Sequence, residues 1–204
     1  EGSELLSLLD ECLSIIDSTM YKLRELKEDI TSLTSLKSYI EEQLVEESEL
    51  DDLKPDNREE LEDLISQRIE QYGPKCNLND IDVSRITDMS FLFCDMTFDG
   101  DISKWDVSRV KNMSSMFAGS TFNGDLSKWD VSRVENMNSM FSYSRFNSDI
   151  SKWDVSRVKN MISMFYDSKF TGDISEWDVS NVKRMHNMFK DSPLEGKEPR
   201  WYRG

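Results

Sequence analysis

The sequence predicts an α + α/β fold with a long N-terminal helix of the coiled-coil type, a short second helix and a solenoid built on a parallel sheet. The solenoid follows from the five tryptophans, which stand at equal intervals of 24 residues. Residues 1–75 hold 21 acidic and 8 basic side chains, whereas residues 76–204 hold 19 and 17. The chain therefore divides into a stalk over residues 1–54, a joint over 55–75 and a repeat region over 76–204.

The stalk is expected to be one acidic helix, because neither Gly nor Pro occurs between Ser3 and Glu47. Its apolar side chains recur every 3.5 residues on average, the period of a left-handed coiled coil. They are Leu9, Leu13, Ile16, Met20, Leu23, Leu26, Ile30, Leu33, Leu36, Ile40 and Leu44. We expect residues 5–45 to form a homo-oligomer, a parallel dimer or trimer, with Cys12 buried. Moderate helix formers around Thr31 leave a helical hairpin as the alternative.

Residues 55–75 predict a short amphipathic helix. Asp56 is placed as its N-cap, with Glu59 three residues later as in a capping box. Gly73 and Pro74 end the helix, because Gly adopts the left-handed conformation and Pro cannot continue a helix. We expect this helix to act as a joint that packs on the repeats or on the stalk.

Five repeat units begin at Ile81, Trp105, Trp129, Trp153 and Trp177. In the second unit, Trp105 and Val107 are two residues apart, which indicates a strand over about 103–107. Apolar residues of 109–117 step by three and four, which indicates a short helix with Ser108 as its N-cap. Each unit is thus expected to be strand, turn and helix, with equivalent strands in a parallel sheet.

The return loop of each unit carries a column of small residues. They are Gly100, Gly124, Ser148, Gly172 and Gly196. We expect a tight turn with positive φ at this column, and strain at Ser148, because Gly adopts positive φ at little cost.

Function is expected where the repeat varies, because the repeated Trp, Val, Met and Phe are explained as core. The variable positions lie in the loops 118–121, 142–145 and 166–169 and in one column of the predicted helices. The candidate partner-binding residues are Ser142, Tyr143, Arg145, Tyr166, Asp167, Lys169, Asn138, Ile162 and His186.

We expect no enzyme, no catalytic residue and no cofactor. His186, the single histidine, stands where other repeats have Ser, Asn and Ile, which is not typical of a catalytic base. Metal ligation is not expected at the repeated aspartates, since Lys104 and its equivalents alternate with them. The three cysteines lack Cys-x-x-Cys spacing, and a bridge between Cys76 and Cys94 stays open.

The charge balance narrows the classes of partner. A net charge of -15 without a basic stripe argues against nucleic acid, which requires clustered Lys and Arg. No apolar run reaches the roughly 18 residues of a membrane span, so direct membrane insertion is not expected. Atypical units at 78–81 and 193–203 predict capping at both ends, and we expect the solenoid to be complete.

The repeat Gly-Asp-Ile-Ser-x-Trp-Asp-Val-Ser-x-Val-x-x-Met-x-x-Met-Phe is matched nearly unbroken four times over residues 76–204. It resembles the repeat of the BspA-like, leucine-rich-repeat-related bacterial surface proteins, which also occurs in Mycoplasma and Listeria lipoproteins and in some phages. The resemblance implies a right-handed solenoid like that of leucine-rich repeats. For some members it also implies cell-surface adhesion to host extracellular-matrix proteins.

The leading hypothesis is a non-enzymatic protein-binding or adhesion module, displayed on an oligomerising helical stalk, whose partner is a host or matrix protein. The alternative is a phage fibre or virion decoration protein, with a virion component as partner. An intracellular scaffold is the third hypothesis. The resemblance favours the cell surface, with the virion second, and the localisation otherwise stays open.

Overall fold

The structure is a computed structural model that describes the backbone of residues 2–51 and 53–204 and the side chains of 10–38 and 53–204. The chain divides into two compact units, Glu1–Asp51 and Asp52–Gly204, and each is described by itself. The predictions for the side chains of Leu9, Ile40 and Leu44 lie outside the described residues.

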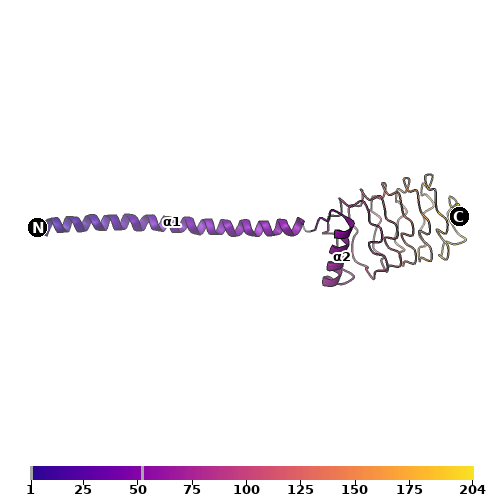
Figure 1. The fold of residues 1–204 in the computed structure, drawn as a ribbon, viewed down its shortest axis with the longest axis horizontal. Coiled ribbons are helices and arrows are strands. Elements are labelled where there is room, and N and C mark those ends of the chain that lie inside the picture. Colours follow the sequence, from indigo (N-terminus) through magenta and orange to yellow (C-terminus); the bar gives the residue numbers. More distant parts are fainter. Residues whose placement is uncertain (1, 52) are drawn as a thin grey trace. The chain divides into compact units, whose positions relative to one another are not determined.

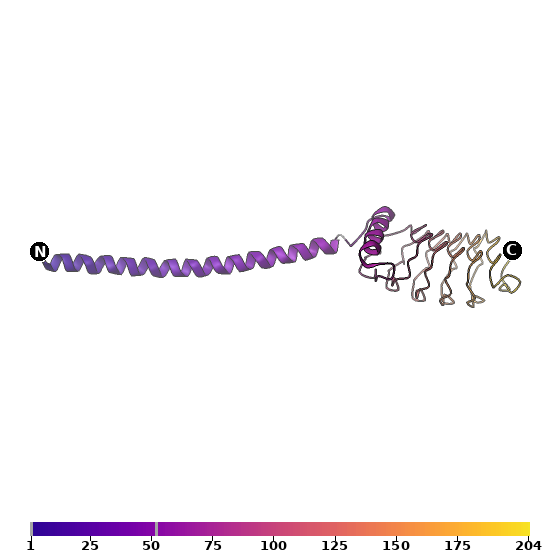
Figure 2. The ribbon, with the colours of Figure 1, turned by 90° about the horizontal axis from the view of Figure 1, so that it is seen from below.

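The first unit is a single helix, α1, over Gly2–Asp51 (Figure 1). The hairpin alternative is therefore wrong. Thr31, Thr34 and Ser35 each donate a hydroxyl hydrogen bond to the carbonyl four residues earlier, at 2.8–3.1 Å, and the helix continues through them with a gentle curve (Figure 2). Burial of Cys12 was also predicted wrongly for the single chain, because the apolar stripe that carries it is exposed.

The second helix, α2, spans Arg58–Tyr72, and its N-cap is Asn57 rather than the predicted Asp56. The Asn57 side chain accepts a hydrogen bond from the N–H of Glu60 at 3.1 Å, and the Glu60 carboxylate accepts from the N–H of Asp56 at 2.8 Å. The arrangement resembles a capping box one residue later than predicted, except that the Glu60 carboxylate binds the N–H of the residue before the N-cap. The Asp56 carboxylate instead pairs with Arg85 at 2.6 Å. Gly73 ends the helix, as predicted, but its φ of 84° and ψ of 172° differ from the left-handed helical conformation that was expected.

Helix α2 packs on the first repeat. Its Leu61 and Ile65 are fully buried and belong to the same hydrophobic core as the repeats. Arg68 pairs with Asp80 of the first repeat at 2.6 Å. The helix therefore closes one end of the repeat core.

The repeats contain no strand, sheet or helix over residues 73–204, so the predicted solenoid of strand-turn-helix units with a parallel sheet is wrong. The β-bridges between neighbouring repeats are isolated parallel ones, such as that between Asn112 and Asn136. Each repeat is instead a succession of turns stacked against the next repeat, visible as parallel loops in Figure 2.

Short Asx turns replace the predicted strand and helix. The N–H of Ser103 donates to Asp101 Oδ1 at 2.9 Å, and the N–H of Ser108 donates to Asp106 Oδ1 at 3.1 Å. Ser108 is therefore not the N-cap of a helix. Consecutive turns, each closed by a hydrogen bond between residues three apart, bring apolar side chains inward at spacings of three and four. These spacings explain the helical period in the sequence.

Neighbouring repeats are joined by backbone hydrogen bonds at alternate residues. In the second unit the N–H groups of 113, 115, 117 and 119 donate to the carbonyls of 136, 138, 140 and 142 at 2.8–2.9 Å. This period of two resembles that of a strand. No strand forms, because Ser115 and Gly119 have φ values of 54° and 66° and turn the chain back at short intervals.

The core of the stack is aromatic. Phenylalanine rings of successive repeats are stacked, with centroids 5.6 Å apart for Phe117 and Phe141. The tryptophans form a second column, with 6.4 Å between Trp105 and Trp129. Each indole N–H donates to a carbonyl 27 residues earlier, as Trp129 does to Ile102 at 3.1 Å, so burial leaves none of these donors unpaired.

The small-residue column serves close packing rather than positive φ, so that prediction is wrong except at Gly196, whose φ is 75°. A Cβ atom on Gly100 would lie 2.5 Å from the ring of Phe98. Ser148 tolerates the position with a negative φ, and its hydroxyl donates to the carbonyl of Asn123 at 2.8 Å.

We predict that the repeat unit loses stability in acid. Hydrogen bonds from a serine two residues later hold the pKa of seven turn aspartates below the ordinary value. They are Asp82, Asp101, Asp125, Asp130, Asp149, Asp173 and Asp178. Because the folded pKa values lie below the unfolded value of about 4, this stabilisation is complete above pH 4 and is lost as the pH falls through the folded values.

Urea unfolding followed by tryptophan fluorescence at a series of pH values tests this prediction. We expect a constant midpoint well above pH 4 and a falling midpoint below it. A midpoint that does not fall between pH 5 and pH 2.5 would contradict the role of the turn aspartates.

Candidate functional site

The candidate residues divide into two sets by position in the repeat. We call the loops 118–121, 142–145, 166–169 and 190–193 the loop edge, since each stands 24 residues from the next and so lies in neighbouring repeats. The second set, Asn138, Ile162 and His186, lies in the turns that precede these loops.

An aromatic and cationic cluster lies on the loop edge. The side chain of Tyr143 is 60% exposed. Its ring meets that of Tyr166 in the next repeat edge-on, with 5.2 Å between centroids. The Nζ of Lys190, one repeat further, lies 5.9 Å from the centroid of the Tyr166 ring. Three successive repeats thus build one continuous surface, which we call the Tyr–Lys cluster (Tyr143, Tyr166 and Lys190).

Within the Tyr–Lys cluster, the phenol of Tyr166 is held in its neutral form. Hydrogen bonding with Asp191, followed by that with Tyr143, raises the pKa of Tyr166 to about 12. Both effects disfavour the phenolate. Tyr166 therefore presents a neutral phenol and ring beside the ammonium group of Lys190, an arrangement suited to the aromatic, carboxylate and carbonyl groups of a protein surface.

The backbone of the loop edge is held firmly while its charged side chains project outward. Arg145 and Lys169 are exposed, and their N–H groups donate to Ser120 and Ser144 of the preceding repeats at 3.2 and 3.1 Å. Asp167 is also exposed, with a φ of 44° and its N–H bonded to the carbonyl of Lys190 at 2.9 Å. A preorganised backbone reduces the entropic cost of binding.

The remaining candidates are placed less favourably. Ser142 is buried, and its hydroxyl donates to the carbonyl of Ser139 at 3.1 Å, so it offers no free side chain. Asn138 and Ile162 are half-buried, and their carbonyls accept hydrogen bonds from the preceding repeat. His186 is exposed but belongs to the turn set and not to the loop edge.

Lys190 and Asp191 were not among the candidate residues, although both contact Tyr166. The 24-residue alignment places Lys190 directly after Tyr166 in the column, and this spacing alone could have identified it. Asp191 stands one column position further, after Asp167. Asp191 therefore contacts Tyr166 from a position one residue beyond the aligned one, which the 24-residue spacing does not predict.

The cysteines, the acidic side chains and a cleft beside α2 are the remaining features that bear on a site. Burial raises the pKa values of the Cys76 and Cys94 thiols, and both cysteines are free, so the predicted possibility of a bridge is not realised. Within the described ranges, no group of three or more His, Cys, Asp or Glu side chains is arranged to hold a metal ion. Of the described helices, none is both long and apolar enough to cross a membrane. A cleft of about 430 Å³ lies between α2 and the first repeat, where Ile69, Met96 and Phe98 form much of its lining.

Comparison with known proteins identifies the repeat family. A family described as Mycoplasma protein of unknown function, DUF285, matches residues 65–168 and 122–194. The match therefore begins inside α2, earlier than the predicted start of the repeats at residue 76. No curated protein and no solved structure matches the chain.

Proposed function

From the premise that the chain belongs to DUF285, a family of Mycoplasma proteins of unknown function, we propose that it is a non-enzymatic protein-binding module of the BspA-like type. Its loop edge binds a host or matrix protein, and α1 assembles copies into a homo-oligomer. The proposal implies that the chain acts at a cell surface, in contact with its partner.

The observation that carries this proposal is the Tyr–Lys cluster. The side chains that recur in every repeat pack in the core or form the Asx turns. The positions of Tyr143, Tyr166 and Lys190 hold different residues in different repeats, and these three side chains meet on one surface. Tyrosine supplies large, rigid contact area at low entropic cost and is enriched at binding hot spots. A varied surface on a uniform scaffold is typical of repeat proteins that recognise other proteins.

The exposed stripe of α1 supports the oligomer. Its large apolar side chains within residues 10–38 are 48–65% exposed in the single chain: Leu13, Ile16, Met20, Leu23, Leu26, Ile30, Leu33 and Leu36. Such a stripe on an isolated helix requires a partner in water, and the heptad period favours another helix. Linking several loop edges raises avidity without any new contact.

We predict that the full chain binds immobilised extracellular-matrix proteins through the Tyr–Lys cluster. Surface plasmon resonance against fibronectin, laminin and collagen separately is the measurement. We expect binding to at least one of them, and a loss of about thirtyfold or more in affinity for the double substitution Tyr143→Ala and Tyr166→Ala, because truncating even one hot-spot aromatic side chain costs about 2 kcal/mol or more.

Phe91→Ala serves as the matched control, since it removes an exposed aromatic ring that lies outside the cluster. The backbone of Phe91 has a positive φ, as that of Tyr143 does. The control should bind as the wild type does. The absence of binding to all three matrix proteins, or an equal loss in the control, would contradict the proposal.

A further inference from the structure

The hydrogen bonds between repeats have a direction, and this makes the two ends of the stack chemically different. In the rows that run through residues 89–95, 113–119, 137–143 and 161–167, the N–H groups of one repeat donate to carbonyls of the next repeat. The first repeat is left with carbonyls that lack such donors. At 185–191, in the last repeat that the structure describes, the N–H groups have no such acceptors among the described backbone carbonyls.

At the first end, α2 supplies a donor. The guanidinium of Arg58 donates through Nη1 to the carbonyl of Ser90 at 2.9 Å, and Ser90 belongs to the row of first-repeat carbonyls. A positively charged donor thus replaces the missing N–H group. Leu61 and Ile65 cover the core beside it.

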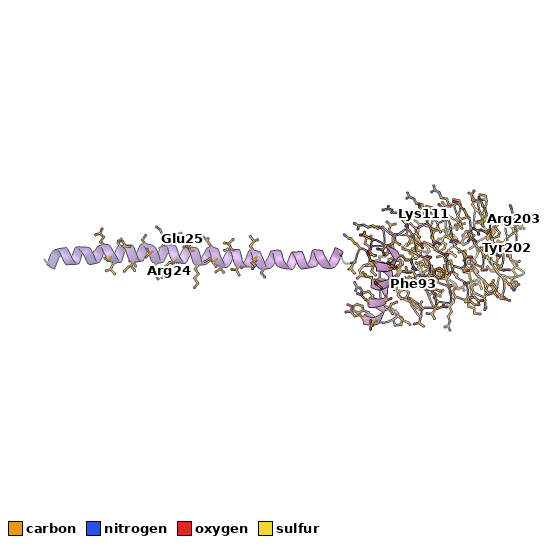
Figure 3. The ribbon with its side chains drawn as sticks, viewed as in Figure 1. Arg24, Glu25, Phe93, Lys111, Tyr202 and Arg203 are labelled. Atoms are coloured by element: carbon orange, nitrogen blue, oxygen red, sulfur yellow. The ribbon has the colours of Figure 1, made fainter. Side chains whose placement is uncertain are left out.

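At the last end, the equivalent row consists of the N–H groups of Met185, Asn187, Phe189 and Asp191. The N–H of Asp191 donates to Glu195 Oε2 at 2.9 Å, so a carboxylate occupies the place of the missing carbonyl. For the other three N–H groups, the described residues provide no acceptor. Tyr202, labelled in Figure 3, lies with its ring edge-on to that of Phe189, with 5.0 Å between the centroids. Asn187 is exposed, so the N–H groups of Met185 and Asn187 are the part of the row that this ring contact does not involve.

Basic residues predominate in the sequence around this row, although the whole chain carries a charge of -15. Residues 181–204 hold six basic and three acidic side chains. Lys183 and Arg184 are both exposed and directly precede Met185 in the sequence. The Lys183 N–H bonds to the carbonyl of Lys159, whose own ammonium group pairs with Glu135 at 2.5 Å. Lys183 thus adds a positive charge next to a pair that is already neutral.

We propose that the last row binds an acidic peptide segment of a partner protein in an extended conformation. Carbonyl oxygens of the segment accept hydrogen bonds from the N–H groups of Met185 and Asn187, as the carboxylate of Glu195 does from Asp191. Its acidic side chains pair with Lys183 and Arg184. In strand addition to a sheet edge, backbone hydrogen bonds likewise provide affinity and side-chain contacts provide specificity.

A second copy of the stack does not fit this surface. The last row of another copy also presents donors, and two rows of donors cannot bond to each other. The first end of another copy is closed by α2. The inference goes beyond the proposed function, because it concerns the end of the stack and not the loop edge.

The test is titration of the isotope-labelled full chain with an acetylated octapeptide of alternating Glu and Thr, followed by backbone amide NMR and amide exchange. We expect the resonances of Met185 and Asn187 to shift and their exchange to slow on binding. The double substitution Lys183→Glu and Arg184→Glu should lower the affinity by about tenfold or more. Lys111→Glu with Lys128→Glu, the same charge change on exposed side chains within the stack, is the matched control and should leave the affinity unchanged.

Three outcomes would overturn this inference. The Met185 and Asn187 amides are unaffected by the acidic peptide, or a peptide with Gln in place of Glu binds equally well. The control substitutions weaken binding as much as the reversal at Lys183 and Arg184. The two amides are already protected in the protein alone in a concentration-dependent way, which would show a second copy on the row. Because none of these measurements uses a matrix protein, failure here and failure of the loop-edge proposal are distinguishable.

Discussion

Replacing Phe141 with Ala is expected to destabilise the repeat unit by about 3–5 kcal/mol, the range for large-to-small changes of a buried aromatic side chain. Phe141 is fully buried in the middle of the stack. Its ring lies 5.6 and 5.8 Å from those of Phe117 and Phe165 and 4.2 Å from that of Phe146. The substitution removes all three contacts and leaves a cavity between repeats that each contact only their neighbours.

Urea unfolding followed by tryptophan fluorescence measures this effect on the repeat unit alone, because all five tryptophans lie at or after residue 105. Phe91→Ala is the control for the same chemical change at a ring that is 54% exposed, and we expect it to shift stability by about 0.5 kcal/mol or less. If the two variants have the same urea midpoint, the aromatic column is not the principal source of stability.

The period of the repeat and the identity of its core were predictable from the sequence, whereas its backbone conformation was not. Trp105, Val107, Val110, Met113 and Phe117 are all buried, as their recurrence indicated. The buried apolar residues are spaced by two and by three to four along the sequence, and in this fold turns produce both spacings. Apolar period alone could not distinguish turns from a strand followed by a helix, because the deciding quantity is the sign of φ.

Positive φ at position 115 and its equivalents shows why the sequence misled. These positions hold Phe91, Ser115, Ser139, Ser163 and Asn187, and glycine, the usual marker of positive φ, is absent from all of them. The glycines that do repeat mark close approach of a phenylalanine ring instead. Tertiary hydrogen bonds to the next repeat stabilise a conformation that local propensity disfavours.

The candidate site was predictable in part, because variation in a repeat marks the positions that the scaffold leaves free. This reasoning identified Tyr143 and Tyr166 but also included Ser142, whose burial depends on a turn that was not anticipated. Arg58 and Glu195 were missed for a related reason. Both act on backbone groups at the ends of the stack, and which groups remain unpaired there depends on the direction of the hydrogen-bond rows.

The double substitution Ile16→Glu and Leu23→Glu is expected to convert a homo-oligomer into monomers. The two side chains are seven residues apart on the apolar stripe of α1 and are 54% and 59% exposed in the single chain. Burial of each side chain in a helical interface stabilises it by about 1.5–3 kcal/mol per chain, and a buried unpaired carboxylate opposes association further. The dissociation constant should therefore rise by several orders of magnitude, which sedimentation velocity at tens of micromolar would detect.

Ile15→Glu with Tyr21→Glu is the matched control, because it introduces the same two charges at apolar side chains of the same helix that are 59% and 63% exposed but lie off the stripe. In a coiled coil only the stripe faces the partner helix, so the control should sediment as the wild type does. Wild-type protein that sediments only as a monomer would refute the oligomer itself. Equal dissociation of both variants would mean that added negative charge on an already acidic helix, rather than loss of the stripe, drives the chains apart.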